Sequence, residues 1–331
     1  MPIHTESNNE TGTRLAQAIA RRPRFVVGGW MAGMGVFVLT FAFLAVRAPG
    51  FLTPVNLVRN LVMPAGIAGV VALGMTVVMA GGGIDLSVGS TAGLAALVAA
   101  TLATRVDLGL PFMLFAAIIA GLLIGTVNGA FVAYLGVNPF VVTLSSVFLI
   151  RGLQFLVTLS AVSGTYLMLP VAMTRAGSSA TFQIGLFLII VVGLYIFLDR
   201  TRPGRYIRAV GESLEVARFS GIPVRFYTWL TYVICGGLVA VGGVMLTSYE
   251  GMARVGTGDG YLIDAFVLPI LGQAVFRRVS VEGTVFGALF MYMVINGLFI
   301  FGTPPVYVNI IKGGLLLAVI LVSGLQKLRE S

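Results

Sequence analysis

A carboxylate interrupts a long apolar region at Asp85, within the run GGGIDLSVGS of residues 81–90. The three glycines break one apolar helix, and Ser87 stands where the next one begins. Backbone freed by such a break must be buried in protein or line a wet cavity. Because a carboxylate near lipid is costly and usually functional, Asp85 and Ser87 are candidates to line a pathway for a polar solute. Capping of the next helix by Asp85 explains the same pattern, and the two roles are compatible.

Three amides lie in or beside other apolar runs, and they are Asn128, Asn138 and Asn296. Such side chains can hydrogen-bond a polyol along a pathway, although bonding between neighbouring helices is their commoner use. Two basic residues, Arg151 and Lys312, also interrupt apolar runs. We expect the long side chain of Lys312 to carry its ammonium group to the membrane surface.

A polar interruption over residues 199–225 predicts a short surface helix between two spans. Acidic residues open this helix, Gly221 can end it in the left-handed conformation, and Pro223 prevents it from resuming. The apolar side chains that it exposes are Leu214, Ala217 and Phe219. They suit docking into a groove of a partner protein. A basic loop resting on anionic headgroups accounts for the same residues equally well.

The whole chain has the composition of a membrane protein. Of its 331 residues, 58% are hydrophobic and 10% are charged, whereas about 25% charged is usual for soluble domains. Apolar stretches of roughly 20 residues, enough to cross a bilayer, predict an all-α polytopic protein of about ten transmembrane helices. The predicted spans are 25–46, 60–80, 87–104, 111–134, 139–159, 182–198, 227–247, 262–276, 284–301 and 306–324. We expect the short spans 87–104 and 262–276 to be tilted, broken or re-entrant.

The distribution of basic residues predicts how the chain is oriented. With ten spans both termini face the same side, and a cytoplasmic N-terminus places fourteen lysines and arginines inside. The outside segments then hold Arg47, Arg59, Arg105, Arg175 and Arg254. Because basic residues favour the cytoplasmic side, we predict an N-in, C-in topology, with tails at 1–24 and 326–331 around a membrane domain at 25–325. The first apolar run is longer than the roughly 7–15 residues of a signal-peptide core, which favours a retained span.

The sequence excludes several kinds of chemistry. The one histidine, His4, lies in the N-terminal tail, and the one cysteine, Cys235, lies in an apolar run where we expect a structural thiol. The clustered His, Asp or Cys residues of a membrane enzyme are missing from the sequence, and we expect no bound cofactor. No G-x-x-x-x-G-K-[ST] motif occurs, so ATP hydrolysis would belong to a separate polypeptide. An ion-coupled transporter would need more carboxylates in its spans than Asp85, because Asp264 and Glu282 lie near predicted span ends.

Five segments follow one another in the order of a known family. They are GGGIDLSVGS (81–90), GLLIGTVNGAFVAY (121–134), NPF (138–140), RYIRAVGESLEVARFSGI (205–222) and GDGYLID (258–264). In this order the chain resembles, from about residue 51 to residue 325, the permease subunits of ribose-type ABC importers, whose superfamily includes branched-chain amino-acid permeases. The resemblance implies a bacterial inner-membrane permease for a small polar solute, a monosaccharide or related polyol. The alternatives are an autoinducer, a nucleoside or a branched-chain amino acid.

The resemblance also implies partners. A cytoplasmic ATPase would drive transport, an extracytoplasmic solute-binding protein would deliver the solute, and a second permease subunit would complete a homodimeric or heterodimeric pathway. The segment that matches the family's coupling helix, which inserts into the ATPase, contains Gly211, Glu212, Leu214, Ala217, Phe219 and Gly221. One segment departs from the family, because residues 273–282 replace a glycine-rich stretch with larger residues. We expect this change to alter helix packing or a cytoplasmic contact.

Overall fold

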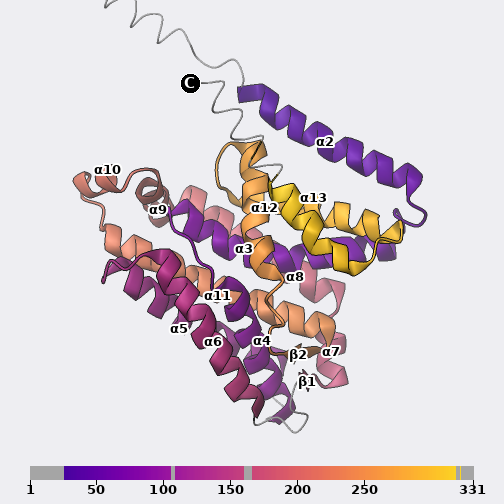
Figure 1. Ribbon diagram of the computed structural model, residues 1–331, viewed down its shortest axis with the longest axis horizontal. Coiled ribbons are helices and arrows are strands. Elements are labelled where there is room, and N and C mark those ends of the chain that lie inside the picture. Colours follow the sequence, from indigo (N-terminus) through magenta and orange to yellow (C-terminus); the bar gives the residue numbers. More distant parts are fainter. Residues whose placement is uncertain (1–25, 106–108, 160–165, 318–320, 322–331) are drawn as a thin grey trace, which may run out of the picture.

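A computed structural model describes residues 26–105, 109–159, 166–317 and 321 of the chain, and nearly all of its elements are helices (Figure 1). In chain order they are α2 (Val26–Arg47), η1 (Asn56–Val62), α3 (Met63–Ala80), α4 (Val88–Arg105), α5 (Leu110–Ala133), α6 (Pro139–Leu159), β1 (Tyr166–Met168), α7 (Val171–Gly177), α8 (Ala180–Tyr195), η2 (Ile196–Arg200), α9 (Arg202–Glu212), α10 (Leu214–Phe219), α11 (Val224–Glu250), β2 (Met252–Arg254), α12 (Tyr261–Phe276), α13 (Val281–Ile300) and η3 (Pro305–Tyr307). The two short strands pair antiparallel, with Leu167 opposite Ala253.

The apolar helices of the described residues match the predicted spans one for one. Seven are long and apolar enough to cross a membrane, and they cover Asn56–Ala80, Val88–Arg105, Leu110–Ala133, Pro139–Leu159, Ala180–Arg200, Val224–Glu250 and Val281–Ile300. The shorter ones are Gly33–Arg47, Tyr261–Phe276 and Pro305–Leu317. The prediction of an all-α polytopic membrane protein is therefore confirmed. The predicted tails, 1–24 and 326–331, lie outside the described residues.

The two spans that we expected to be irregular differ from each other. α4 is one continuous helix of 18 residues, so the expected irregularity lies before it, in the non-helical residues 81–87. α12 has 16 residues and carries Pro269 in its interior, where a proline removes a backbone hydrogen bond and kinks a helix. The break predicted at the three glycines is thus present.

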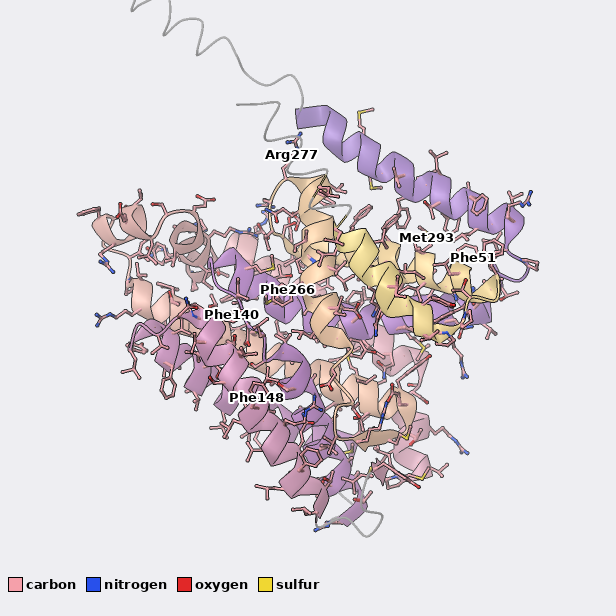
Figure 2. The ribbon with its side chains drawn as sticks, viewed as in Figure 1. Phe51, Phe140, Phe148, Phe266, Arg277 and Met293 are labelled. Atoms are coloured by element: carbon pink, nitrogen blue, oxygen red, sulfur yellow. The ribbon has the colours of Figure 1, made fainter. Side chains whose placement is uncertain are left out.

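α3 lies at the centre of the molecule, whereas α5 and α6 lie along one side (Figure 1). In the span that contains α3, 89% of the most apolar window is buried, compared with 22% for α5. The outer helices expose large apolar side chains such as Phe148 of α6 (Figure 2) and Ile189 of α8. A helix that is apolar on its outside as well as its inside is typical of contact with lipid.

Glycines bring α5 and α11 into direct backbone contact. A Cβ atom on Gly121 would lie 2.1 Å from the carbonyl oxygen of Gly236, and one on Gly125 would lie 2.2 Å from that of Tyr232. Small residues at such crossings let membrane helices approach closely. Cys235 is fully buried beside this contact, which confirms the prediction of a structural thiol.

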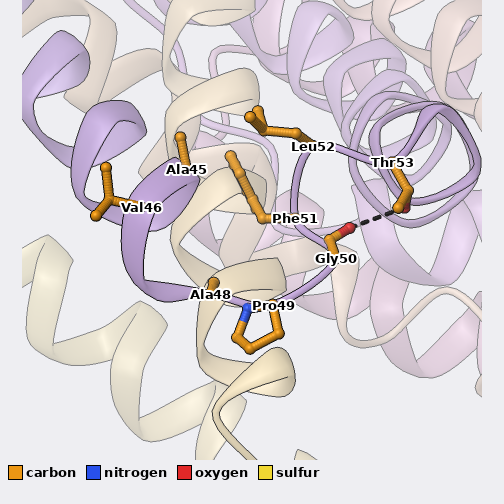
Figure 3. A pocket seen from close by; sticks show the side chains of 8 residues that line it. All are labelled: Ala45, Val46, Ala48, Pro49, Gly50, Phe51, Leu52 and Thr53. Carbon is orange, nitrogen blue, oxygen red and sulfur yellow. Dashed lines mark hydrogen bonds between the residues drawn. The ribbon is translucent and has the colours of Figure 1, made fainter.

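α2 runs along one edge of the molecule, next to α12 and α13 (Figure 1). The loop that follows it turns back toward the core, and the Thr53 hydroxyl donates to the Gly50 carbonyl at 2.8 Å (Figure 3). Phe51 of this loop is fully buried and belongs to one apolar cluster with Met293 of α13 (Figure 2). The loop therefore anchors the first span against α13.

Candidate functional site: a pathway break and its coupling segment

The break between α3 and α4 is organised by Asp85. α3 ends at Ala80, Gly82 has a φ of +78°, and α4 begins at Val88. The side chain of Asp85 is buried, and its Oδ1 accepts from the Ser87 amide at 2.8 Å and from the Ser87 hydroxyl at 2.6 Å. Asp85 therefore caps the turn before α4. The predicted cap on the first-turn amides of α4 is wrong in its partner, because Ser87 precedes the first residue of the helix. A contact with solute stays a prediction.

Two further helices join this cap. Asn128 of α5 donates to the Ser87 hydroxyl at 3.0 Å, and the Ser146 hydroxyl of α6 donates to the Asn128 carbonyl oxygen. We call Asp85, Ser87, Asn128 and Ser146 the Asp85 cluster. Its polar groups bond to one another across α4, α5 and α6, so the structure brings together three of the five predicted pathway residues. Sequence reasoning missed Ser146, because one hydroxyl in an apolar helix carries no distinctive signal.

The other two predicted pathway residues lie elsewhere. Asn138 caps α6, where its Oδ1 accepts from the Phe140 amide at 2.9 Å. Asn296 is buried in α13 and exchanges hydrogen bonds with Asn56 of η1, at 2.9 and 3.0 Å. The five residues thus occupy three separate places.

Residues 211–221 were predicted to form one surface helix. In the structure they are divided between the end of α9 and the whole of α10. α9 ends at Glu212, Ser213 is extended with a φ of −158°, and its hydroxyl accepts from the Val216 amide to cap α10. A serine that can cap a new helix competes with continuation of the old one. At the far end, Gly221 has a φ of +74°, and the Ile222 amide donates to the Ala217 carbonyl at 3.1 Å. The predicted left-handed stop is confirmed, and its bonding is that of a Schellman motif.

The apolar residues of α10 divide between two faces. Phe219 is 89% exposed and Leu214 is 49% exposed, as predicted, but Ala217 is only 2% exposed. The prediction that Ala217 is exposed is wrong, because it faces inward on this amphipathic turn while Phe219 faces outward. An aromatic ring left almost wholly exposed at the end of a helix is suited to insertion into a partner's pocket.

The coupling segment, residues 202–221, touches the break directly. A Cβ atom on Gly211 would lie 2.1 Å from the Ala80 carbonyl oxygen and 2.9 Å from the Gly82 amide nitrogen. Beside this contact is a pocket of about 440 Å³, which residues 81–83 of the break share with Leu214 and Arg218 of α10. The end of α9 therefore packs directly against the end of α3. Nothing in the sequence links position 211 to position 80, since the contact is made only by folding.

Charged groups tie the same segment to the turn between α12 and α13. The Arg208 guanidinium donates to the Val279 carbonyl at 2.9 Å and to Asp199 at 3.0 Å. Arg278 lies 3.2 Å from Asp199 and 2.8 Å from Glu282. The segment that departs from the family, 273–282, thus makes a contact with the coupling segment. That the larger residues alter this contact stays a prediction.

A second carboxylate is buried in the first turn of α12. Asp264 of α12 is fully buried, and the Lys312 ammonium lies 2.7 Å from it. The Tyr292 hydroxyl of α13 donates to Asp264 at 2.9 Å. We call these three residues the Asp264 cluster. The expectation that Lys312 reaches the membrane surface is wrong, because a buried carboxylate without its partner would be far more costly than the burial of both charges as a pair.

The fold and these two clusters define a class: a polytopic membrane protein whose spans are interrupted by buried polar groups and whose surface segment exposes an aromatic ring. Comparison with known proteins gives the family. The model for the family described as "Branched-chain amino acid transport system / permease component" matches residues 57–320. The chain belongs to this family and is the permease subunit of an ABC importer, a multi-pass protein of the inner membrane.

Relatives from several bacteria match at similar levels. The "Autoinducer 2 import system permease protein LsrD" of Photorhabdus luminescens is 33% identical over 262 residues, which cover 75% of this chain and 77% of that protein. The proteins of the same name from Salmonella typhimurium and Yersinia pestis are each 32% identical over 263 residues, covering 76% of this chain and 78% of theirs. No solved structure matches the chain significantly. The family predicted from the five sequence segments is confirmed.

Proposed function

We propose that this chain and a second permease subunit form the pathway of an importer for autoinducer 2 or a closely similar small neutral solute. A binding protein outside the membrane delivers the solute, and a separate cytoplasmic ATPase supplies the energy. The names of the relatives support autoinducer 2 as the solute. The ribose-type motifs at residues 81–90 and 205–222 support a simple sugar as the second candidate.

The observation that carries the coupling mechanism is the contact between Gly211 and the end of α3. The Phe219 ring is exposed in α10, and the ATPase binds the segment through this ring. Displacement of α10 by the ATPase is passed through α9 to the backbone at Ala80 and Gly82, beside the Asp85 cluster. The excess of basic residues places this segment in the cytoplasm, where ATP is available.

Truncation of the exposed ring tests this mechanism. The chain is co-expressed with its ATPase, binding protein and second permease subunit, and the complex is purified and reconstituted into liposomes. We expect Phe219→Ala to weaken retention of the ATPase and to abolish uptake, with normal abundance in the membrane, because the ring contacts little within the chain. Phe148→Ala is the matched control, since Phe148 is 71% exposed on the outer face of α6.

Two results would contradict the proposal. One is full ATPase retention and uptake by Phe219→Ala protein, which would make the segment a loop on the lipid headgroups. The other is ATP hydrolysis by the purified chain alone.

Gly221→Val tests the shape of the same segment. Valine in the left-handed region costs roughly 1–2 kcal/mol, and nothing lies within 4 Å to clash with the new side chain. The strain therefore acts on the last turn of α10 and shifts Phe219. We expect normal membrane abundance, weakened ATPase association and little uptake. Loss of the protein from the membrane would instead assign Gly221 a role in folding.

A further inference from the structure

A polar pocket of about 410 Å³ lies between η1, the start of α3, the end of α11 and α13. Its polar lining consists of Asn56, Asn60, Tyr249, Tyr292 and Asn296, and its apolar lining consists of Pro64, Ile295, Phe299 and Ile300. The volume is within the range of small-molecule sites, roughly 300–1,000 Å³. Of the described residues that line it, none carries a formal charge.

The amides of the pocket are held at defined positions. Asn56 and Asn296 are buried and exchange two hydrogen bonds, and Asn56 also donates to the Phe51 carbonyl at 3.0 Å. Asn60 is exposed, and its amide donates to the Asn56 carbonyl oxygen at 3.1 Å. Asn56 and Asn60 are both part of η1, a π-helical turn, and such turns are frequent at functional sites. The result is a line of three amides from the exterior to the buried floor.

The two phenols are also oriented by the protein. The Tyr249 hydroxyl donates to the Arg59 carbonyl at 3.2 Å, and the Tyr292 hydroxyl donates to Asp264, which Lys312 neutralises. A phenol that donates to a fixed partner keeps lone pairs with which to accept. The Asp264 cluster therefore serves as the support behind Tyr292, so Tyr292 can accept from a hydroxyl group in the pocket.

The lining selects a class of solute. Amide groups both donate and accept. Asn56 uses both of its N–H groups and both lone pairs of its oxygen within the protein, so Asn60 and Asn296 are the amides that can bond a hydroxyl group. The apolar wall can cover the carbon face of a small ring. An amino acid or a sugar phosphate would bring a full charge to a lining without a charged partner, which is strongly unfavourable. Selectivity along a pathway depends on such lining groups.

The position of the pocket agrees with a role in entry. Tyr249 lies at one end of α11, and the coupling segment adjoins the other end. The 27 residues of α11 span about 40 Å, more than the roughly 30 Å of the hydrocarbon core. The pocket thus opens at the face of the membrane opposite the coupling segment, where the solute arrives.

We propose that this pocket is the entry site of the pathway and binds a small, neutral, polyhydroxylated ring solute through Asn60, Asn296 and the two tyrosines, with Asn56 holding the other two amides in position. The inference rests on the proposed function, because it names the site where the imported solute is first held.

The test uses the complete importer in liposomes, with labelled ribose, autoinducer 2 and leucine as probes. Two variants, Asn60→Ala and Asn296→Ala, each remove one amide, and Asn309→Ala makes the same change at an exposed position outside the pocket. We expect both pocket variants to lower uptake of the ring solute about tenfold, as the loss of about 1.4 kcal/mol of binding would. ATP hydrolysis stimulated by the loaded binding protein should stay at the native level, and Asn309→Ala should match the native importer.

The outcomes separate this inference from the proposed function. Native uptake by both variants overturns the pocket and leaves the importer standing. Uptake of leucine in place of the two ring solutes overturns the solute class, and uptake of none of the probes contradicts the proposed function as well. If Asn296→Ala protein fails to reach the membrane, uptake by the Asn60→Ala importer alone decides whether the pocket binds the solute. Asn60 is exposed, so its amide contributes little to folding.

Discussion

The Asp85 cluster and the Asp264 cluster both bury a carboxylate, but they satisfy it in different ways. Asp85 accepts from the amide and hydroxyl of Ser87, two residues away, and neutral groups of α5 and α6 extend the network. Asp264 is paired with the ammonium group of Lys312, 48 residues away, and with the Tyr292 phenol. The carboxylate of the Asp85 cluster is therefore satisfied by a neighbour in the sequence, and it is the one charged group of that cluster. The carboxylate of the Asp264 cluster is satisfied by an ion pair between residues far apart in the sequence.

This difference has consequences for stability and for function. Loss of a neutral member such as Ser146 from the Asp85 cluster costs about 1 kcal/mol, whereas removal of one partner of the Asp264–Lys312 ion pair leaves an uncompensated buried charge. The Asp85 cluster lies beside the coupling segment, where the proposed mechanism calls for small rearrangements. The Asp264 cluster ties α12 and α13 to the helix that carries Lys312, and it suits a part of the protein that stays fixed.

Loss of the ammonium group should give the largest effect. Lys312→Ala leaves Asp264 buried without its charge partner, so we expect destabilisation by about 3–5 kcal/mol. The checking measurement is thermal unfolding of the detergent-purified protein, together with its abundance in the membrane.

The double variant Asp264→Asn with Lys312→Met is the control. It removes both charges and keeps similar volumes, so it should recover most of the lost stability. Equal instability of the single and the double variants would show that packing, rather than charge, holds these helices together.

Loss of the Asp85 carboxylate should have a smaller effect. Asp85→Ala removes the acceptor of the Ser87 amide and hydroxyl, with an expected cost of about 1–3 kcal/mol for the buried donors left unpaired. Asp85→Asn keeps a side-chain oxygen that can accept from Ser87, so it should retain most of the native stability in the same unfolding assay. Uptake decides whether Asp85 also serves the pathway: an Asn variant with native stability and no uptake would show that the negative charge itself is required.

The smallest effects should come from single hydroxyl groups at the edge of each cluster. Tyr292→Phe removes the bond to Asp264, and Ser146→Ala removes the bond to Asn128, each with an expected cost of about 1 kcal/mol. The two variants should differ in uptake, because Tyr292 also lines the proposed entry pocket. Equal uptake by both would weaken the distinction drawn between the clusters.

The general architecture could be predicted because it depends on local properties of the chain. Apolar runs of spanning length gave helices at the predicted positions, and the three glycines gave a break before α4. Gly221 ended α10 as predicted because its conformation is set by its immediate neighbours. Ser213 is also a local signal, because serine is a common helix cap. Recognising it would have predicted the division of the coupling segment into α9 and α10.

The candidate site was predicted in its parts and not in its arrangement. The sequence determined which polar groups lie within apolar helices, because a residue's type and its neighbours decide how costly its burial is. Only the tertiary structure decided their partners: Lys312 with Asp264, Asn296 with Asn56, and Gly211 with Ala80. The physical reason is that buried polar groups must be satisfied but accept any suitable partner that packing brings within reach. Sequence alone can state the need for a partner, and the packing of the helices supplies it.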